Sequence, residues 1–301
     1  MYIVKHRIIF YVISGILLVG SLFALGMWGL KPGIDFTGGS IIEVEYASST
    51  RPTIDVVRPG IEKLEIGEFS VRETGDSGFI IRTKELTPEA HNAVIASLAA
   101  NAQITEKRFD SVGPILGKEA LEKSWMSIAL VLIAIVLFIT FAFRGVSRPV
   151  KSWKYGLIAV VALAHDVIIP AGVFAALGHF VGIEVDTLFV TALLVILGFS
   201  IHDTIVVFDR VRENLKHNRE GNNKKSFEHI VGESINQTFV RSINTSLTTI
   251  IAILVLYLVG AEATRHFSLA LLIGITAGTY SSIFLGSPLL VTVYNWQKGK
   301  E

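Results

Sequence analysis

Three ionisable residues stand inside stretches of the sequence that are otherwise apolar, and they are the side chains best able to do chemistry. Asp166 lies in ALAHDVIIP, Asp203 in LGFSIHDTIVVF, and Arg241 in INQTFVRSINTSLTTI. Charged groups inside membrane-spanning helices are costly and usually face a bundle interior or water. A carboxylate near a base can bind and release a proton as its surroundings change. The residues therefore predict either a proton path or static buried groups that hold helices together.

The depth of these residues allows Asp203 and Arg241 to meet across a helix bundle. Asp203 lies about 9 Å from the cytoplasmic end of its predicted helix, at 1.5 Å per residue, and Arg241 is similarly shallow. His202 precedes Asp203. Histidine side chains often transfer protons, and packing or capping is the alternative role of His202. Thr245 and Thr248 belong to a polar run after Arg241. Asp166 has two possible roles: it relays protons, or it is a buried acid whose hydrogen bonds come from neighbouring hydroxyls.

Six apolar runs provide the helices that must position these side chains. A helix needs about 20 apolar residues to cross a hydrocarbon core of about 30 Å. Runs of this length are 8–30, 124–143, 155–177, 185–208, 240–259 and 267–293. Charged residues make up 18% of the chain, against about 25% in soluble domains. We therefore predict six transmembrane helices, the first of them a retained anchor because its apolar run is too long for a signal peptide.

The distribution of Lys and Arg predicts the orientation of these helices. Basic residues mark the cytoplasmic side, and they gather before residue 8, after residue 293 and within 144–154 and 209–239. The connection 178–184 contains none. The pattern predicts a multi-pass protein in contact with membrane lipid, with both termini in the cytoplasm and a cytoplasmic loop at 209–239.

The segment 32–123 then lies outside the cytoplasm and carries its own fold. Its signals follow the order βαββαβ, with an alternating strand in SIIEVEY, a hairpin turn at TGDSG and a helix start at TPEA. In that helix Thr87 is the N-cap and Pro88 the first residue. This order predicts a ferredoxin-like α+β domain. Because it shows no catalytic triad or carboxylate pair, we expect it to bind or move something.

The stretch GIDFTGG connects the first apolar run to this domain. It lacks the lysine and the spacing of a phosphate loop, and one aspartate cannot hold a metal alone. We predict that Pro32 and Gly33 end the first helix and that a glycine pair turns the chain into the first strand. The predicted joint, through which helix movement would reach the domain, consists of Gly33, Asp35, Phe36, Gly38 and Gly39.

Composition excludes several other classes of site and partner. The chain has no cysteine, which excludes disulfides, thiolate metal sites and cysteine nucleophiles. Its eight histidines form no metal-ligand pattern such as HExxH. A net charge of +1 argues against nucleic-acid binding. We expect no cofactor, no metal and no enzymatic activity.

Four motifs together resemble the SecF family, the smaller membrane subunits of the SecDF protein-export complex. They are GIDFTGGSIIEVEY, ALAHDVII, FSIHDTIVVFDRVREN and INQTFVRSINTSLTTI, in this order along nearly the whole chain. The resemblance implies an RND-type membrane fold with an extracytoplasmic ferredoxin-like domain in a bacterial cytoplasmic membrane. It implies SecD as partner. It also implies use of the proton-motive force to help preproteins outward after the SecYEG channel and SecA have engaged them.

The resemblance also implies roles for individual residues. Asp203 matches the family's proton-pathway aspartate and Arg241 the arginine that works with it, while Asp166 and the hydroxyls of Thr245 and Thr248 would line the same path. His202 stands where the family commonly has asparagine, so the operating pH of Asp203 is open. Two alternatives remain open as well: half of an RND-type small-solute transporter, and a non-transporting membrane scaffold.

Overall fold

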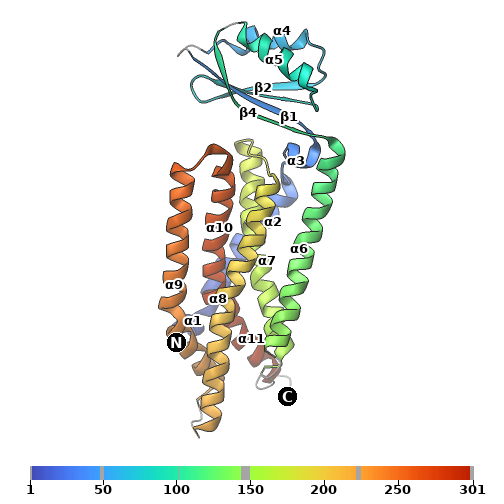
Figure 1. The fold of residues 1–301 in the computed structure, drawn as a ribbon. Coiled ribbons are helices and arrows are strands. Elements are labelled where there is room, and N and C mark those ends of the chain that lie inside the picture. The colour runs from blue at the N-terminus through green and yellow to red at the C-terminus, as the bar shows by residue number, and fades with distance from the viewer. Residues whose placement is uncertain (1, 48–50, 101, 144–149, 222–224, 299–301) are drawn as a thin grey trace. The chain divides into compact units, whose positions relative to one another are not determined.

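The computed structural model describes residues 2–47, 51–100, 102–143, 150–221 and 225–298 (Figure 1). The chain divides into two compact units, and each is described by itself. One unit is a helical bundle made of Met1–Lys31 and Met126–Glu301, and the other is the domain Pro32–Trp125.

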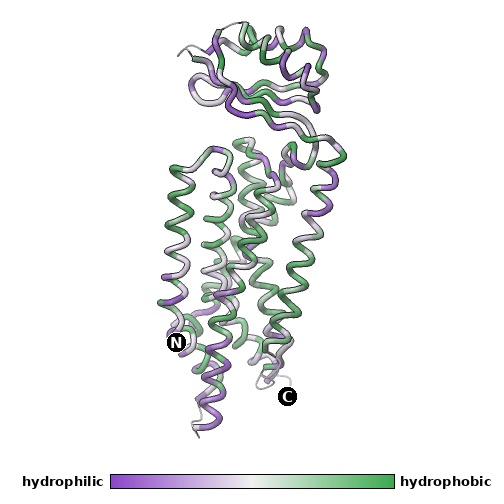
Figure 2. Tube along the Cα trace, in the orientation of Figure 1, coloured by the Kyte–Doolittle hydropathy of each residue, from purple (hydrophilic) through white to green (hydrophobic). Residues whose placement is uncertain are grey.

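Long helices build the bundle. They are α2 (Arg7–Met27), α6 (Pro114–Ala142, of which the first turns belong to the domain), α7 (Ser152–Phe180), α8 (Thr187–Glu220), α9 (Phe227–Val259), α10 (Arg265–Ser281) and α11 (Ser287–Lys298). Short elements accompany them: α1 (Tyr2–Lys5), the 3-10 turn Glu262–Thr264 and the π-helical turn Ser282–Gly286, which joins α10 to α11. Among the described residues, six segments are long and apolar enough to cross a membrane, which confirms the predicted number of spans. Figure 2 shows their hydrophobic residues in green.

The helices extend beyond the predicted apolar runs, and the prediction of a loop at 209–239 is wrong. Most of that segment is helical, because α8 continues to Glu220 and α9 starts at Phe227. The apolar run of α8 stops where charged residues begin, as the purple end of α8 in Figure 2 shows, but the helix continues through these charged residues. Arg210 donates to Glu213 three residues later at 2.9 Å, a spacing that supports a helix. Ser226 caps α9. Basic positions at 144–149, 222–224 and 299–301 lie outside the described residues.

The first transmembrane helix ends earlier than the sequence predicts. We expected Pro32 and Gly33 to end it, whereas α2 ends at Met27 and Gly29 adopts a positive φ of 66°. Such a φ belongs to the left-handed region that glycine tolerates and that commonly stops a helix. Gly33 instead precedes a new short helix, α3 (Ile34–Thr37).

A buried apolar core holds the bundle together. Tyr155, Phe143 and Phe208 are almost fully buried. The Tyr155 ring stacks on Phe143 at 5.5 Å and meets Phe208 edge-on at 5.4 Å. The most apolar windows of α7 and of the last span are 61% buried, whereas that of α6 is only 6% buried. The apolar surface of α6 is therefore left to lipid or to a partner.

The domain is a four-stranded antiparallel sheet with two helices on one face (Figure 1). Its strands are β1 (Gly39–Tyr46), β2 (Phe69–Thr74), β3 (Gly78–Thr83) and β4 (Ile104–Val112), in the order β2-β3-β1-β4. The helices are α4 (Ile54–Glu62) and α5 (Pro88–Ala99), and Thr87 caps α5 as predicted, accepting from the Ala90 N–H at 3.3 Å. Apolar residues that alternate along the strands pack against the helices. The ferredoxin-like prediction is confirmed.

Candidate functional site

Asp166 lies at the centre of a buried hydrogen-bonded cluster. Its side chain is fully buried. Its Oδ2 accepts hydrogen bonds from Ser200 of α8 and, at 2.8 Å, from Ser281 of α10. Its Oδ1 lies 2.9 Å from Nδ1 of His165, the preceding residue on α7. Both carboxylate oxygens are thus engaged by side chains from three helices, which stabilises a charge away from water.

Glycines allow α10 to approach this cluster. A Cβ atom at Gly278 would lie 3.0 Å from Ser200 Cβ and 3.5 Å from Asp166 Oδ2. One turn earlier, a Cβ atom at Gly274 would overlap the side chain of Ile196. The absence of side chains at these two positions brings α10 close enough to α8 for Ser281 to reach Asp166.

The π-helical turn adds a second layer of hydroxyls. Ser282 donates to the Ser200 carbonyl at 3.2 Å, and its Oγ lies 2.9 Å from Oγ1 of Thr204. Ser287 donates to the Ser282 carbonyl at 2.9 Å. Single π-turns inside helices often occur at functional sites. Here the turn starts directly after α10, so two successive buried serines, Ser281 at the end of α10 and Ser282 in the turn, face the cluster.

Asp203 has fewer partners than Asp166. It is 2% exposed, and one hydroxyl, that of Ser246 on α9, donates to its Oδ2 at 3.1 Å. The imidazole of His202 lies 3.7 Å from its Oδ1 and is 62% exposed. Within the described part of the chain, no direct ion pair joins Asp203 to Arg241.

The register of α9 explains why a serine takes the position expected for the arginine. Ser246, and not Arg241, stands at the level of Asp203. The five-residue difference corresponds to about 7.5 Å along a helix. The Arg241 side chain is exposed on this chain. Depth estimated from the ends of apolar runs could not resolve this offset, because those runs do not coincide with the helix ends.

In the part of the chain that the structure describes, neither Thr245 nor Thr248 hydrogen-bonds to Asp166 or Asp203. Thr248 is exposed and donates to the backbone carbonyl of Thr245 at 2.8 Å, and Thr249 donates to the same carbonyl at 3.0 Å. The hydroxyls that do meet the carboxylates come from Ser246, a member of the same polar run after Arg241, and from two serines that sequence reasoning missed, Ser200 and Ser281. Their only signal in the sequence is a small polar residue within an apolar run.

The predicted joint is a tight backbone contact inside the domain. Gly38 and Gly39 have φ of 74° and 123°, values that side chains rarely adopt. A Cβ atom at Gly38 would lie 2.7 Å from the Cα of Pro114, and one at Gly117 would lie 2.9 Å from the Gly38 nitrogen. Phe36 is buried beside them. The segments that enter and leave the domain therefore pack backbone against backbone.

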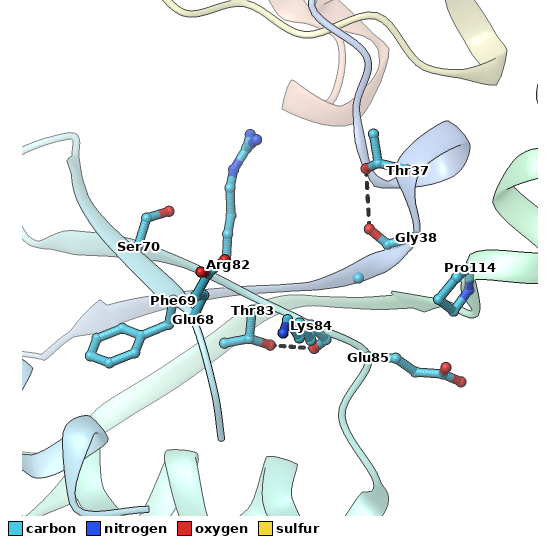
Figure 3. A pocket seen from close by; sticks show the side chains of 11 residues that line it. Thr37, Gly38, Glu68, Phe69, Ser70, Arg82, Thr83, Lys84, Glu85 and Pro114 are labelled. Carbon is cyan, nitrogen blue, oxygen red and sulfur yellow. Dashed lines mark hydrogen bonds between the residues drawn. The ribbon is translucent and has the colours of Figure 1, made fainter. Parts of the chain in front are cut away.

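A groove of about 660 Å³ borders this joint (Figure 3). Figure 3 shows Thr37, which donates to the Gly38 carbonyl at 3.1 Å, and Thr83, which donates to the Lys84 carbonyl at 2.7 Å. Arg82 projects from the strand there, and burial lowers its pKa from the usual value, with Arg72 and Arg108 adding repulsion. Among the residues that the structure describes, no three His, Asp or Glu side chains could hold a metal ion.

Comparisons with known proteins agree over nearly the whole chain. The family described as "Protein export membrane protein SecD/SecF, C-terminal" matches residues 93–296, and the "SecD/SecF GG Motif" matches residues 23–50, which include the joint. "Protein translocase subunit SecF" of Thermobaculum terrenum is 42% identical over 97% of this chain and 94% of its own length. That of Anaerolinea thermophila is 38% identical over 99% of this chain and 94% of its own length.

Solved structures show the same likeness. The crystal structure of SecDF from Thermus thermophilus, described as a translocon-associated membrane protein, matches with a TM-score of 0.82 and 30% identity over 98% of this chain. A super-membrane-facing form of SecDF matches with a TM-score of 0.67 and 29% identity. This chain spans 39% of each SecDF chain. Six apolar spans and these relatives identify a multi-pass protein of the bacterial inner membrane, and the chain belongs to the SecF family of protein translocase subunits.

Proposed function

We propose that this chain works with a SecD-type partner and uses the proton-motive force to assist the export of preproteins. The observation that carries the proposal is Asp203, a buried carboxylate with one hydroxyl donor at 3.1 Å and the imidazole of His202 at 3.7 Å. Such a group has only part of the stabilisation that a permanent buried charge needs. Gain or loss of a proton therefore changes what holds α8 against α9. No cofactor takes part, because the proton gradient supplies the energy.

A partner completes the site. His202 and Arg241 flank the buried carboxylate, and both are exposed on this chain. Val240 and Leu247, on α9, are exposed as well, at 65% and 49%. This chain matches 39% of a SecDF chain, and that likeness supports a SecD subunit over this surface. Through that complex the chain would act together with the SecYEG channel, SecA and the preprotein, in contact with membrane lipid.

The proton cycle acts through helix packing. Protonation of Asp203 neutralises the carboxylate, weakens its attraction to Arg241 and allows α8 and α9 to shift. Release of the proton restores the attraction. The shift reaches the domain through the joint around Gly38, whose close backbone contacts transmit movement rather than absorb it. The domain then holds the emerging polypeptide and prevents it from sliding back.

Charge and placement support an orientation with both termini in the cytoplasm. α1 packs against α9 and α11, so the first and last helices of the chain meet at one end of the bundle (Figure 1). Lys5 and Lys298 lie at this end, and the charged last turns of α8 extend from it. Basic residues favour the cytoplasmic side. The Asp203 proton would then enter from the outer side and leave inward.

Replacement of Asp203 by Asn in the reconstituted complex tests this function. We expect the variant to assemble with its partner and to retain ATP-driven translocation while losing stimulation by a proton gradient. Asp209→Asn is the matched control, because Asp209 is about half exposed and pairs with Arg212 at 2.5 Å at the charged end of α8. A scaffold would tolerate both changes. A solute antiporter would lose proton-coupled solute flux and leave preprotein export intact.

A further inference from the structure

One face of α9 carries a row of buried hydroxyls that leads away from Asp203. The row consists of Ser246, Ser242, Thr238 and Ser234, each four residues from the next. Residues at this spacing lie one above another on a helix. None of the four is more than 5% exposed. A buried polar stripe of this length inside an apolar bundle is costly unless it has partners or a use.

Hydrogen bonds at both ends of the row set the register of α8 against it. At one end Ser246 donates to Asp203 at 3.1 Å. At the other end Asn214 donates to Ser234 at 2.8 Å and to Gln237 at 3.0 Å. The two helices run in opposite directions, so residues 203–214 of α8 lie along residues 246–234 of α9. The row therefore connects the buried carboxylate to partly exposed amides near the end of the bundle that carries the termini.

Opposite the middle of the hydroxyl row, the facing helix α8 carries apolar side chains. Val207 and Val211 follow Asp203 by one and two turns, and the register places them level with Ser242 and Thr238. Both valines are at most 1% exposed. Thr238 donates to its own helix, to the Ser234 carbonyl at 3.0 Å. The Ser242 hydroxyl is buried and has no hydrogen-bond partner among the described residues, which is the exception among buried polar groups.

We propose that this row is the inward route of the Asp203 proton and that Val207 and Val211 hold it closed in the present conformation. The inference rests on the proposed function and adds to it the residues through which the proton leaves. A structural explanation would be that small residues let α8 and α9 pack closely. That explanation accounts for Thr238 and Ser234, which bond within α9, but leaves the unpartnered hydroxyl of Ser242 unexplained.

The chemistry requires only water in addition to these side chains. Successive hydroxyls are about 6 Å apart along the helix, a gap that one water molecule bridges. Each oxygen receives one proton and releases its own to the next, so one proton moves along the row with no redox change. The valines exclude water while the helices are packed. Protonation of Asp203 allows α8 to shift against α9, and this shift lets water enter the row.

A leak measurement tests the gate. Val207→Ala in the complex, reconstituted into vesicles with a trapped pH-sensitive dye, should raise passive proton flux about tenfold, since a smaller side chain lets water reach the row. Val195→Ala is the matched control because Val195 is an exposed valine of the same helix, and its flux should equal that of the wild type. A wild-type flux in Val207→Ala would overturn the gate.

A loss of function at Ser242 tests the route. Ser242→Ala should lower proton-stimulated export about tenfold, less than the roughly 100-fold or more expected for a lost general acid or base, because water partly replaces the hydroxyl. Ser242→Thr should restore export by returning a hydroxyl. Thermal stability should be unchanged or higher in Ser242→Ala, because an unsatisfied buried group is removed. Thr276→Val, which removes an exposed hydroxyl of α10 bonded within its own helix, is the control.

The outcomes separate this inference from the function on which it rests. If Asp203→Asn loses proton stimulation while Val207→Ala and Ser242→Ala behave as the wild type, the inward route is wrong and the proposed function stands. If Asp203→Asn keeps full proton stimulation, both are wrong. Loss of export in Ser242→Ala together with lower thermal stability would also overturn the route, since it would reveal a packing role.

Discussion

Asp166 and Asp203 are buried carboxylates of the same bundle, and their surroundings differ. Asp166 has side-chain partners on both oxygens, including Ser200, Ser281 and His165. Asp203 has one hydroxyl donor, Ser246, and a longer approach from His202 at 3.7 Å. Hydrogen bonds to the charged form stabilise it. Asp166 is therefore suited to hold three helices in place, and Asp203 to change its charge.

The difference also clarifies the π-helical turn. It supplies hydroxyls to the Asp166 cluster and also reaches Thr204, the residue after Asp203, through Ser282. The Asp166 cluster thus lies beside Asp203, the residue that we propose to gain and lose a proton. We infer that the Asp166 cluster provides a fixed frame against which α9 moves, because interfaces with complete hydrogen bonding resist rearrangement.

The largest expected effect separates the two carboxylates by function. Asp203→Asn should reduce proton-stimulated export by about 100-fold, the low end for loss of an acid–base group, and change thermal stability little, because the amide still accepts from Ser246. Asp166→Asn should instead lower thermal stability clearly and reduce proton-stimulated export less than Asp203→Asn does. Export assays and circular-dichroism melting curves of the same preparations check both. If both variants lost export equally and kept the wild-type thermal stability, the two carboxylates would not differ in role.

The next effect concerns the stability of the Asp166 cluster. Asp166→Ala should lower the free energy of unfolding by about 3 kcal/mol or more, because two serine hydroxyls and an imidazole lose their acceptor in a buried site. The melting temperature of the purified complex measures it. The melting temperature of Asp166→Asn, which keeps one acceptor oxygen, should lie between those of Asp166→Ala and the wild type. A wild-type melting curve for Asp166→Ala would show that water replaces the carboxylate.

A smaller effect tests how closely α10 must approach the cluster. Gly278→Ala should cost about 1–3 kcal/mol through overpacking, since its Cβ would stand 3.0 Å from that of Ser200. Gly198→Ala on α8 is the control, because no described atom lies within 4 Å of its added Cβ. We expect that control to be neutral or slightly stabilising. Thermal melting curves distinguish the two variants, and equal curves for Gly278→Ala and Gly198→Ala would rule out a close approach of α10 to α8.

The smallest effect comes from a carboxylate on the domain surface, which serves as an exposed reference for both buried ones. Lys107, 2.7 Å from Glu45, lowers the pKa of Glu45 with help from Ser77. The folded pKa is thus below the unfolded one of about 4.3. The pair stabilises the domain above that pH, and this contribution disappears as the pH falls through the folded pKa. Glu45→Gln should therefore lower the melting temperature slightly at pH 7, and the difference from the wild type should shrink as the pH falls through the folded pKa of Glu45.

Much of the architecture could be predicted from the sequence because the signals are local. Apolar runs of sufficient length predict six spans, and alternation, turn residues and the Thr87 cap predict the βαββαβ domain, all of which the structure confirms. Helix ends were less predictable. Hydropathy stops at the membrane edge, whereas charged turns such as those after Asp209 remain helical through pairs along the helix.

The sequence by itself determined which charged residues enter the membrane and that a domain interrupts the spans after the first. The tertiary structure decided the partners of those charges. Whether Asp203 meets Arg241 or Ser246 depends on the rotation and register of α9, and whether Ser200 and Ser281 reach Asp166 depends on the glycines that bring α10 close. Rotation and register arise from packing between helices distant in the chain, and no local pattern records them.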